Sequence, residues 1–221
     1  MRPRILAFDL NQTLTNFEPL QPAFRRVFGG RATADDWFAL LLHYSTVVTL
    51  TDSYADFRTL GQATLKMLAA ERGAEMIDED VATIFSAMIA LPAHKDVPEG
   101  LAQLREAGFR MIVLTNSPAA SAAQQVENAG LSRYFDEIIS VDSVRRFKPA
   151  PEVYRFAAAK MGVEPREMML IAAHAWDVYG ALRAGCRAAY VSRGAKPLFP
   201  LDPQPEIAKP DLKAVASALL R

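Results

Sequence analysis

Short runs of apolar residues, each followed by a polar or small-residue cluster, constrain the fold of this chain more than any other feature. The first run covers residues 4–8 and leads directly into Asp9. A continuous apolar run of this length is typical of a strand buried on both faces of a sheet. The pattern recurs at residues 110–114, 137–141, 168–171 and 188–191. The sequence therefore predicts five buried strands.

Helical patterns fill most of the intervals between these runs. They span residues 99–107, 119–129, 151–161 and 176–184, and a glycine follows each of them directly. Glycine is the usual residue just past a helix because it adopts the left-handed conformation without a Cβ clash. Strands that alternate with such helices indicate a parallel sheet covered on both faces. The predicted fold class is α/β, with a doubly wound, Rossmann-like sheet.

The interval from residue 16 to residue 94 lacks this alternation. Helical periodicity is present over residues 34–44, 54–72 and 78–89, but no buried strand run occurs. We therefore predict an all-helical cap domain over residues 16–94, inserted into an α/β core formed by residues 1–15 and 95–221. Near the end of the chain, the proline-rich segment 197–210 is expected to be a surface loop that leads to a short helix over 212–220.

Composition and charge exclude several classes of protein. Hydrophobic residues make up 51% of the chain and charged residues 23%, which is too apolar for a disordered protein. Twenty-five basic and 25 acidic residues cancel, so no overall field attracts nucleic acid or an anionic membrane. The single cysteine cannot form an internal disulfide, and the three histidines lack the spacing of a zinc site. Without a secretory signal or a membrane-spanning run, we expect a cytoplasmic protein with no nucleic-acid or membrane partner.

The polar residues that follow the predicted strands are the candidates for a functional site, because ligands of open α/β sheets bind beyond the carboxyl ends of the strands. This set combines a carboxylate placed as a nucleophile, donors suited to an anionic group, and one cation. It predicts a hydrolase that acts through a covalent aspartyl intermediate. The residues are Asp9, Asn11, Thr13, Thr115, Asn116, Lys148, His174 and Asp177.

Four segments of the chain resemble, in order, the four motifs of the haloacid dehalogenase superfamily. They are Asp9–Leu14, Leu114–Ser117, Phe147–Pro149 with Tyr154 after it, and Ala173–Asp177 with Gly180 after it. Each motif is weak alone, but the four occur in the right order and at strand ends. The resemblance extends to Arg193 and implies a helical cap inserted after the first motif.

Two positions indicate a subgroup within that superfamily. Phosphatases of this fold carry a second aspartate two residues after the nucleophile, whereas this chain has Asn11, which cannot donate a proton as an acid. The fourth motif of metal-dependent members carries an acidic pair, but here Ala173 precedes Asp177 by four residues. Hard cations require several oxygen ligands, so we expect neither a metal ion nor another cofactor. Both features resemble the L-2-haloacid dehalogenases.

The resemblance implies a reaction and a role for each residue. Asp9 attacks the halogen-bearing carbon of a small 2-haloalkanoic acid and displaces halide, and water then cleaves the ester. Lys148 keeps Asp9 ionised, and Asp177 positions or activates the water. The expected catalytic residues are Asp9, Thr13, Lys148, His174 and Asp177. The expected substrate-binding residues are Asn11, Phe38, Phe57, Thr115, Asn116, Tyr154 and Trp176.

The chain departs from the dehalogenase pattern at two of these positions. Phe38 follows Trp37 where the dehalogenases have an arginine that helps to take up the halide, and His174 replaces an asparagine. His174 is therefore a candidate base or halide-side donor. Two alternatives remain open: a Mg²⁺-dependent phosphatase on a small phosphomonoester that also uses Asp9, and a member without turnover that binds a small carboxylate or a protein partner. Homodimerisation, common in the resembling group, is also left open.

Overall fold

A parallel sheet lies at the centre of the computed structural model, which describes residues 2–221. Within those residues the sheet has six strands in the order β3-β2-β1-β4-β5-β6, and every neighbouring pair is parallel. The chain reverses its direction of winding at β1, which lies between β2 and β4. The strands are β1 (Ile5–Phe8), β2 (Arg110–Thr115), β3 (Glu137–Ser140), β4 (Met168–Ala172), β5 (Arg187–Val191) and β6 (Ile207–Lys209).

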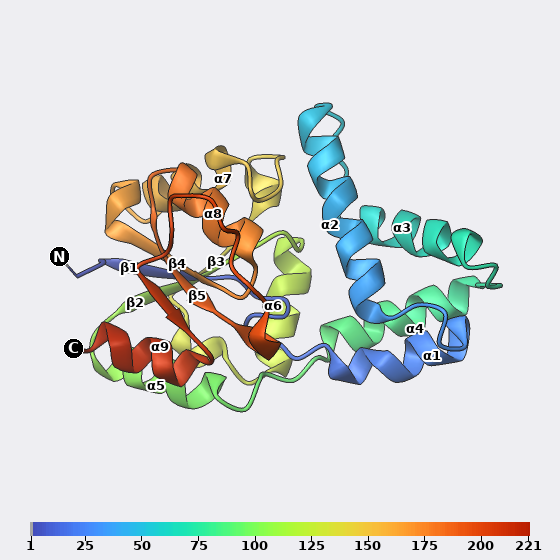
Figure 1. Ribbon diagram of the computed structural model, residues 1–221, viewed down its shortest axis with the longest axis horizontal. Coiled ribbons are helices and arrows are strands. Elements are labelled where there is room, and N and C mark those ends of the chain that lie inside the picture. The colour runs from blue at the N-terminus through green and yellow to red at the C-terminus, as the bar shows by residue number, and fades with distance from the viewer. Residues whose placement is uncertain (1) are drawn as a thin grey trace.

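Helices cover both faces of this sheet (Figure 1). Alternate residues of β1 enter different cores: Ile5 packs on the face covered by α7 and α8, and Leu6 packs on the face covered by α5, α6 and α9. This arrangement confirms the predicted doubly wound α/β fold. The helices are α5 (Val97–Glu106), α6 (Ala119–Asn128), α7 (Pro151–Lys160), α8 (Ala175–Arg183) and α9 (Leu212–Leu219).

Four helices, which we call the cap helices, lie to one side of the sheet, away from both ends of the chain (Figure 1). They are α1 (Gln21–Phe28), α2 (Ala34–Leu50), α3 (Phe57–Glu71) and α4 (Asp78–Ile89). A capping box at Thr33 and Asp36 begins α2, since each side chain accepts from the other residue's backbone N–H. Short 3₁₀ helices connect other elements at Glu18–Leu20, Ser132–Tyr134, Val141–Ser143, Pro165–Glu167 and Arg193–Ala195.

The two chain segments that lead into and out of the cap helices lie side by side. Asn16 donates its backbone N–H to Pro92, and His94 donates its backbone N–H to Leu14. The predicted boundaries between core and cap, at residues 16 and 94, lie in these two segments and stay a prediction. No helix within residues 2–221 combines the length and the apolar character needed to cross a membrane.

Several element boundaries differ from the sequence-based expectation, each for a local reason. Helix α2 continues to Leu50, beyond the predicted end. Its hydroxyl side chains are compatible with helical backbone because, as at Ser45, they donate to a carbonyl of the preceding turn. Helix α3 begins only at Phe57 because Asp56 accepts from two N–H groups of its first turn. The short helix α1 was not predicted.

Strand β6 lies in the segment 197–210 that was expected to be a loop. It pairs with the edge of β5, where Ala189 lies opposite Ile207. Two backbone bonds extend the pairing, from Glu206 to Ala188 and from Ser192 to Lys209. The three residues of β6 are partly or fully exposed. An exposed edge strand this short contains no buried apolar run, so its sequence carries no strand signal.

Candidate active site

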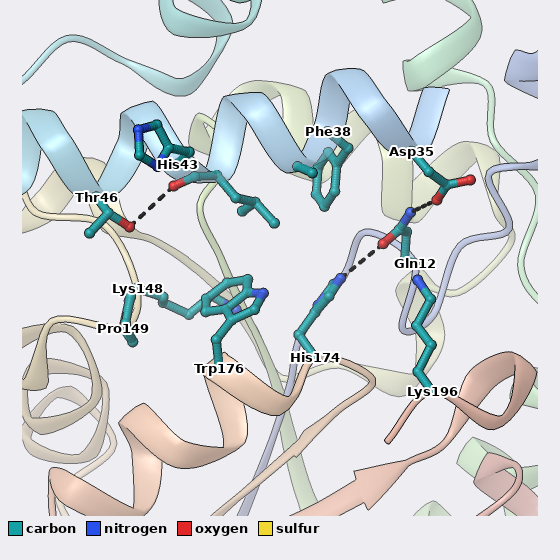
Figure 2. A pocket seen from close by; sticks show the side chains of 12 residues that line it. Gln12, Asp35, Phe38, His43, Thr46, Lys148, Pro149, His174, Trp176 and Lys196 are labelled. Atoms are coloured by element: carbon teal, nitrogen blue, oxygen red, sulfur yellow. Dashed lines mark hydrogen bonds between the residues drawn. The ribbon is translucent and has the colours of Figure 1, made fainter. Parts of the chain in front are cut away.

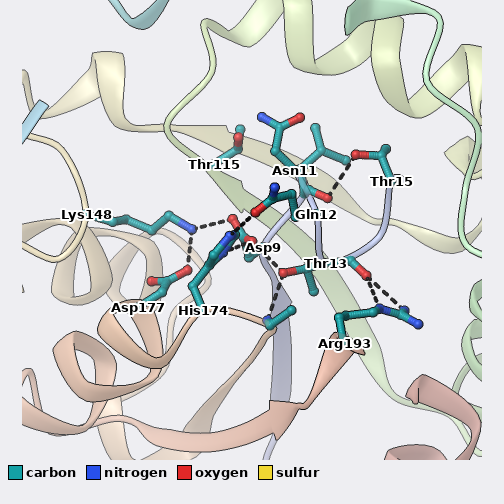
Figure 3. A network of polar contacts seen from close by, with 12 residues as sticks. Asp9, Asn11, Gln12, Thr13, Thr15, Thr115, Lys148, His174, Asp177 and Arg193 are labelled. Atoms are coloured by element: carbon teal, nitrogen blue, oxygen red, sulfur yellow. Dashed lines mark hydrogen bonds and ion pairs between the residues drawn. The ribbon is translucent and has the colours of Figure 1, made fainter. Parts of the chain in front are cut away.

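A buried lysine joins two buried carboxylates at the carboxyl edge of the sheet (Figure 3). Lys148 Nζ lies 2.8 Å from Asp9 Oδ1 and 2.6 Å from Asp177 Oδ2, and it also donates to the carbonyl of Leu114 at 3.1 Å. The Lys148 side chain is only 1% exposed. Asp9 directly follows β1, whereas Asp177 lies in the first turn of α8. The parallel register of β1, β2 and β4 therefore brings together residues far apart in the chain.

The charges of these groups follow from burial and from their partners. Burial opposes ionisation of Asp9, but Lys148 and His174 outweigh it and hold the pKa of Asp9 well below its usual value. Burial raises the pKa of Asp177, and the opposing effect of Lys148 does not cancel that rise. The pKa of Lys148 is raised despite its burial because both carboxylates face it. Asp9 is thus an ionised nucleophile at neutral pH, and Asp177 is the more basic carboxylate of the pair.

The second oxygen of Asp9 has two partners. Thr13 Oγ1 donates to Asp9 Oδ2 at 2.5 Å, and Thr13 Oγ1 accepts the backbone N–H of Ala173 at 2.9 Å. His174 Nδ1 lies 3.1 Å from the same carboxylate oxygen. The structure therefore brings together all five predicted catalytic residues, and Thr13 fixes the orientation of the Asp9 carboxylate.

Tyr154 contacts Asp177 in the interior of the site. Its hydroxyl donates to Asp177 Oδ1 at 2.6 Å, and its side chain is fully buried. Burial and the neighbouring Asp177 raise the pKa of Tyr154 well above its usual value, so the hydroxyl keeps its proton and acts as a donor. Tyr154 is not among the residues that line the cavity described below. Tyr154 therefore orients Asp177, and a substrate-binding role for Tyr154 stays a prediction.

The three polar residues expected to bind substrate behave differently from one another. Asn11 donates to Ser117 Oγ at 3.0 Å and accepts from Gln125 at 3.1 Å, so its amide serves the internal structure of the site. Thr115 Oγ1 accepts from the backbone N–H of Ser117 at 3.1 Å. Asn116 Oδ1 accepts from the backbone N–H of Lys148 at 3.0 Å, whereas its buried Nδ2 has no hydrogen-bond partner within residues 2–221. Asn116 therefore has a donor to offer a ligand.

A cavity of about 540 Å³ lies between α2 and the carboxyl edge of the sheet (Figure 2). Phe38 extends into it from the cap side, 6.0 Å from the ring of His174, and Trp176 stacks on His174 at 5.3 Å. Lys148 also lines it. The remaining lining residues, none of which was a predicted site residue, are Gln12, Asp35, Ala39, Leu42, His43, Thr46, Pro149 and Lys196.

Phe57 is not among the residues that line this cavity, and its predicted role in substrate binding stays a prediction. As the first residue of α3 it packs against Phe38 with ring centroids 6.2 Å apart, and against Phe147 at 5.7 Å. It supports Phe38 from behind. Trp37 is fully buried and donates its indole N–H to the Gly61 carbonyl, so it belongs to the cap interior.

The residues of the site do not fit a bound Mg²⁺ ion. The position four residues before Asp177 is Ala173, and the Lys148 ammonium already bridges Asp9 and Asp177. A hard cation requires several anionic or neutral oxygen ligands. Within residues 2–221 no group of three or more histidine, cysteine or acidic side chains is arranged to hold a metal.

Gly180 of α8 is packed so tightly that a side chain there should disturb the site. An added Cβ would lie 2.5 Å from Pro149 Cβ and 2.8 Å from Tyr154 Oη. Glycine to alanine in a helix usually stabilises by about 0.5–1 kcal/mol. Because this Cβ overlaps the residue next to Lys148, we expect Gly180→Ala to destabilise by about 1–3 kcal/mol instead.

Urea unfolding measures the free energy of unfolding of the Gly180→Ala variant. Its turnover should also be lower than that of the wild type because Pro149 must shift. Arg183→Ala at an exposed position of the same helix is the control and should change stability by less than about 0.5 kcal/mol. A Gly180→Ala protein more stable than the wild type would refute this packing argument.

The fold and site together define a class of protein: a hydrolase with a doubly wound α/β core, whose nucleophile is an aspartate at the end of the first strand, beneath a helical cap. The model of the haloacid dehalogenase-like hydrolase family matches residues 3–185. The chain belongs to that family, which confirms the resemblance seen in its motifs.

Individual proteins similar to this chain include several 2-haloacid dehalogenases. An (S)-2-haloacid dehalogenase of Xanthobacter autotrophicus is 31% identical over 192 residues, which cover 86% of this chain and 75% of that protein. An L-2-haloacid dehalogenase of known structure superposes with a TM-score of 0.96 at 25% identity, over 100% of both chains. The L-2-haloacid dehalogenase of Xanthobacter autotrophicus with chloropropionic acid covalently bound has a TM-score of 0.89 at 26% identity, over 100% of this chain and 99% of that one.

Proposed function

We propose that this protein hydrolyses the carbon–halogen bond of small (S)-2-haloalkanoic acids through an ester on Asp9, without a metal ion. The observation that carries the proposal is the buried, ionised Asp9 held between Lys148 and His174 at the edge of a largely apolar cavity. The similar proteins support it, since those compared above are (S)- or L-2-haloacid dehalogenases and one is known with chloropropionic acid covalently bound.

In the first step a carboxylate oxygen of Asp9 bonds to the carbon that carries the halogen. The carbon–halogen bond breaks, its electron pair leaves with the halide, and the carbon inverts. Halide leaves without a proton, so no acid is required at Asn11, whose amide is engaged with Ser117 and Gln125. Lys148 keeps Asp9 in the ionised form that this attack requires.

In the second step water attacks the Asp9 carbonyl carbon and releases the 2-hydroxy acid. Asp177 accepts the proton that the water loses, since it is the more basic carboxylate and Tyr154 and Lys148 hold it in place. The ester C–O bond on the acyl side breaks, the alkoxide takes up a proton, and the Asp9 carboxylate is restored. The net reaction consumes one water and releases one halide and one proton.

The substrate carboxylate requires donors near Asp9. Asn116 Nδ2 is the buried donor without a partner, and we assign it this role together with the Thr115 hydroxyl. Phe38 and Trp176 form the apolar walls that exclude bulk water from the ester.

No observation favours the alternatives considered from the sequence. A phosphatase of this fold requires an acid two residues after the nucleophile and an acidic pair that holds a cation. This chain has Asn11 at the first position, and Ala173 in place of the first acid of the pair. A member without turnover has no need for an ionised, buried nucleophile. A cytoplasmic location, homodimerisation and the absence of nucleic-acid and membrane partners stay predictions.

The proposal is tested by measuring halide release from L- and D-2-chloropropionate with and without EDTA, beside phosphate release from p-nitrophenyl phosphate with Mg²⁺. We expect halide from the L enantiomer, a rate that EDTA leaves unchanged within about twofold, and no phosphate. Reactions without enzyme correct for spontaneous hydrolysis. Magnesium-dependent phosphate release without halide would overturn the proposal.

A further inference from the structure

Three hydrogen bonds connect Asp9 to the first turn of cap helix α2 (Figures 2 and 3). His174 Nδ1 lies 3.1 Å from Asp9 Oδ2, and His174 Nε2 lies 3.0 Å from Gln12 Oε1. Gln12 Nε2 donates to Asp35 Oδ1 at 2.6 Å. Gln12 and Asp35 both line the cavity. Neither the family motifs nor the proposed mechanism gives either residue a task.

The direction of these bonds follows from the chemistry of their two ends. An ionised carboxylate only accepts hydrogen bonds, so the Gln12 amide must present its NH₂ group to Asp35. Its oxygen is then turned toward His174 Nε2, while the Asp9 carboxylate oxygen faces His174 Nδ1. Both ring nitrogens of His174 therefore face oxygen acceptors.

The backbone around Gln12 is held in the conformation that makes this geometry. Gln12 has φ +62°, a left-handed conformation that is unfavourable for residues other than glycine. Its carbonyl is a partner of His94 Nε2 at 3.3 Å. The next carbonyl, that of Thr13, accepts two bonds from Arg193, whose guanidinium also pairs with Asp96 at 2.6 Å. The surrounding contacts thus maintain a strained residue at one place in the cavity wall.

We propose that Gln12 and Asp35 are positioning residues that hold the His174 ring in one orientation, with Nδ1 facing Asp9. The part of the proposal that concerns catalysis rests on the proposed function. As Asp9 attacks, its negative charge moves to the departing halide. A ring donor that is fixed beside Asp9 and lines the same cavity is placed to face this charge during the step.

Other charged groups face His174 from the elements packed around it. Lys148 bonds the other carboxylate oxygen of Asp9 and pairs with Asp177. Asp35 acts through Gln12, and Lys196 is exposed at the cavity rim. Phe38 and Trp176 supply no charge to the ring faces that they cover. Of the described cavity-lining side chains that contact Asp9, Lys148 is shared with Asp177, whereas His174 has no second carboxylate bonded to it.

The hydrogen bonds of the His174 ring are directly observable in the resting protein. The chain has three histidines, so ¹⁵N spectra of histidine-labelled protein are simple, and His174→Asn assigns the signals of interest. In Asp35→Ala the Gln12 amide is free to turn, so the His174 Nε2 signal should shift as its bond to Gln12 is lost. An Asp35→Ala protein whose His174 signals match those of the wild type would overturn the proposal.

Two further variants separate positioning from general stability. Gln12→Gly removes the amide but suits the left-handed backbone, so it should fold and show the same shift of the His174 Nε2 signal as Asp35→Ala. Asp36→Ala removes the neighbouring carboxylate, which caps α2 through Thr33 and does not contact Gln12. It should lower the stability of the protein and leave the His174 signals unchanged. An equal effect of Asp36→Ala and Asp35→Ala on His174 would contradict the proposal.

The steady-state kinetics of L-2-bromopropionate turnover supply the catalytic test. Gln12 and Asp35 act on the step in which charge moves to the halide, so their loss should lower kcat more than it changes KM. We expect Asp35→Ala and Gln12→Gly to lower kcat by about threefold or more and to weaken inhibition by bromide. An unchanged kcat, or a rise in KM alone, would contradict positioning. Absence of halide release from the wild type would refute the proposed function, while the spectra still decide the state of His174.

Discussion

Asp9→Asn is expected to lower the rate of halide release by about ten-thousand-fold or more, because an amide oxygen does not displace halide and no ester forms. The carboxamide has nearly the same shape, so Lys148 and Thr13 keep most of their contacts and the fold should survive. Circular dichroism and urea unfolding check the fold. Mass spectra taken during the assay identify any protein in which the asparagine has reverted to aspartate, which would otherwise mimic residual activity.

A single turnover in H₂¹⁸O tests the same step from the wild-type side. If water attacks the Asp9 carbonyl, the label of the first turnover enters the Asp9 side chain, and the product hydroxyl keeps an unlabelled oxygen. Peptide mass spectrometry locates the label, with excess enzyme over substrate. Label found in the product hydroxyl after one turnover would mean that water attacks the substrate carbon directly, and Asp9 would then not be the nucleophile.

Lys148→Met is expected to cost about 3–5 kcal/mol of stability and to abolish turnover, because it leaves two buried carboxylates without their shared cation. Burial already opposes the ionisation of Asp9 and Asp177, and without Lys148 their pKa values should rise. An acid whose pKa is raised in the folded state destabilises the fold increasingly as pH rises through the unfolded pKa. The loss of stability should therefore be larger at pH 8 than at pH 5.

Urea unfolding at these two pH values measures the effect of Lys148→Met. Lys160→Met is the matched control, since Lys160 pairs with Glu137 but its side chain is 40% exposed. An exposed pair contributes about 1 kcal/mol or less, so this variant should remain close to the wild type at both pH values. A Lys148→Met protein that is as stable as Lys160→Met would show that the buried pair carries no uncompensated charge.

Residues that contact one another through the sheet edge were accessible to sequence reasoning, because each follows a strand whose buried run is visible in the sequence. Asp9 follows the run at 4–8, and His174 follows the run at 168–171. Residues contributed by the cap were less accessible. Phe38 and Phe57 have the same character and similar helical context, yet only Phe38 lines the cavity. Which of two aromatic side chains faces the core depends on how α2 and α3 pack, and periodicity alone does not determine this.

Gln12 and Asp35 show the same limit from the opposite direction. Neither was predicted as a site residue, because a polar residue in a loop and an acid in the first turn of a helix are ordinary. Their contact spans 23 positions and joins the core to the cap. It forms because α2 lies over the sheet edge, which the sequence does not reveal. The signal that was available in the sequence is the position of Gln12 between Asn11 and Thr13, inside the first motif.

The α/β class, the helical cap, the nucleophile and the replacement of an acid by Asn11 could be predicted from the sequence, because buried strands, helix ends and motif residues are local features of the chain. Which hydrogen bonds these residues form depends on tertiary packing: Tyr154 bonds to Asp177, and the second ring nitrogen of His174 bonds to Gln12. The physical reason is that a buried polar group must find a partner. Which partner it finds depends on distances between segments that only the packing of sheet and cap sets.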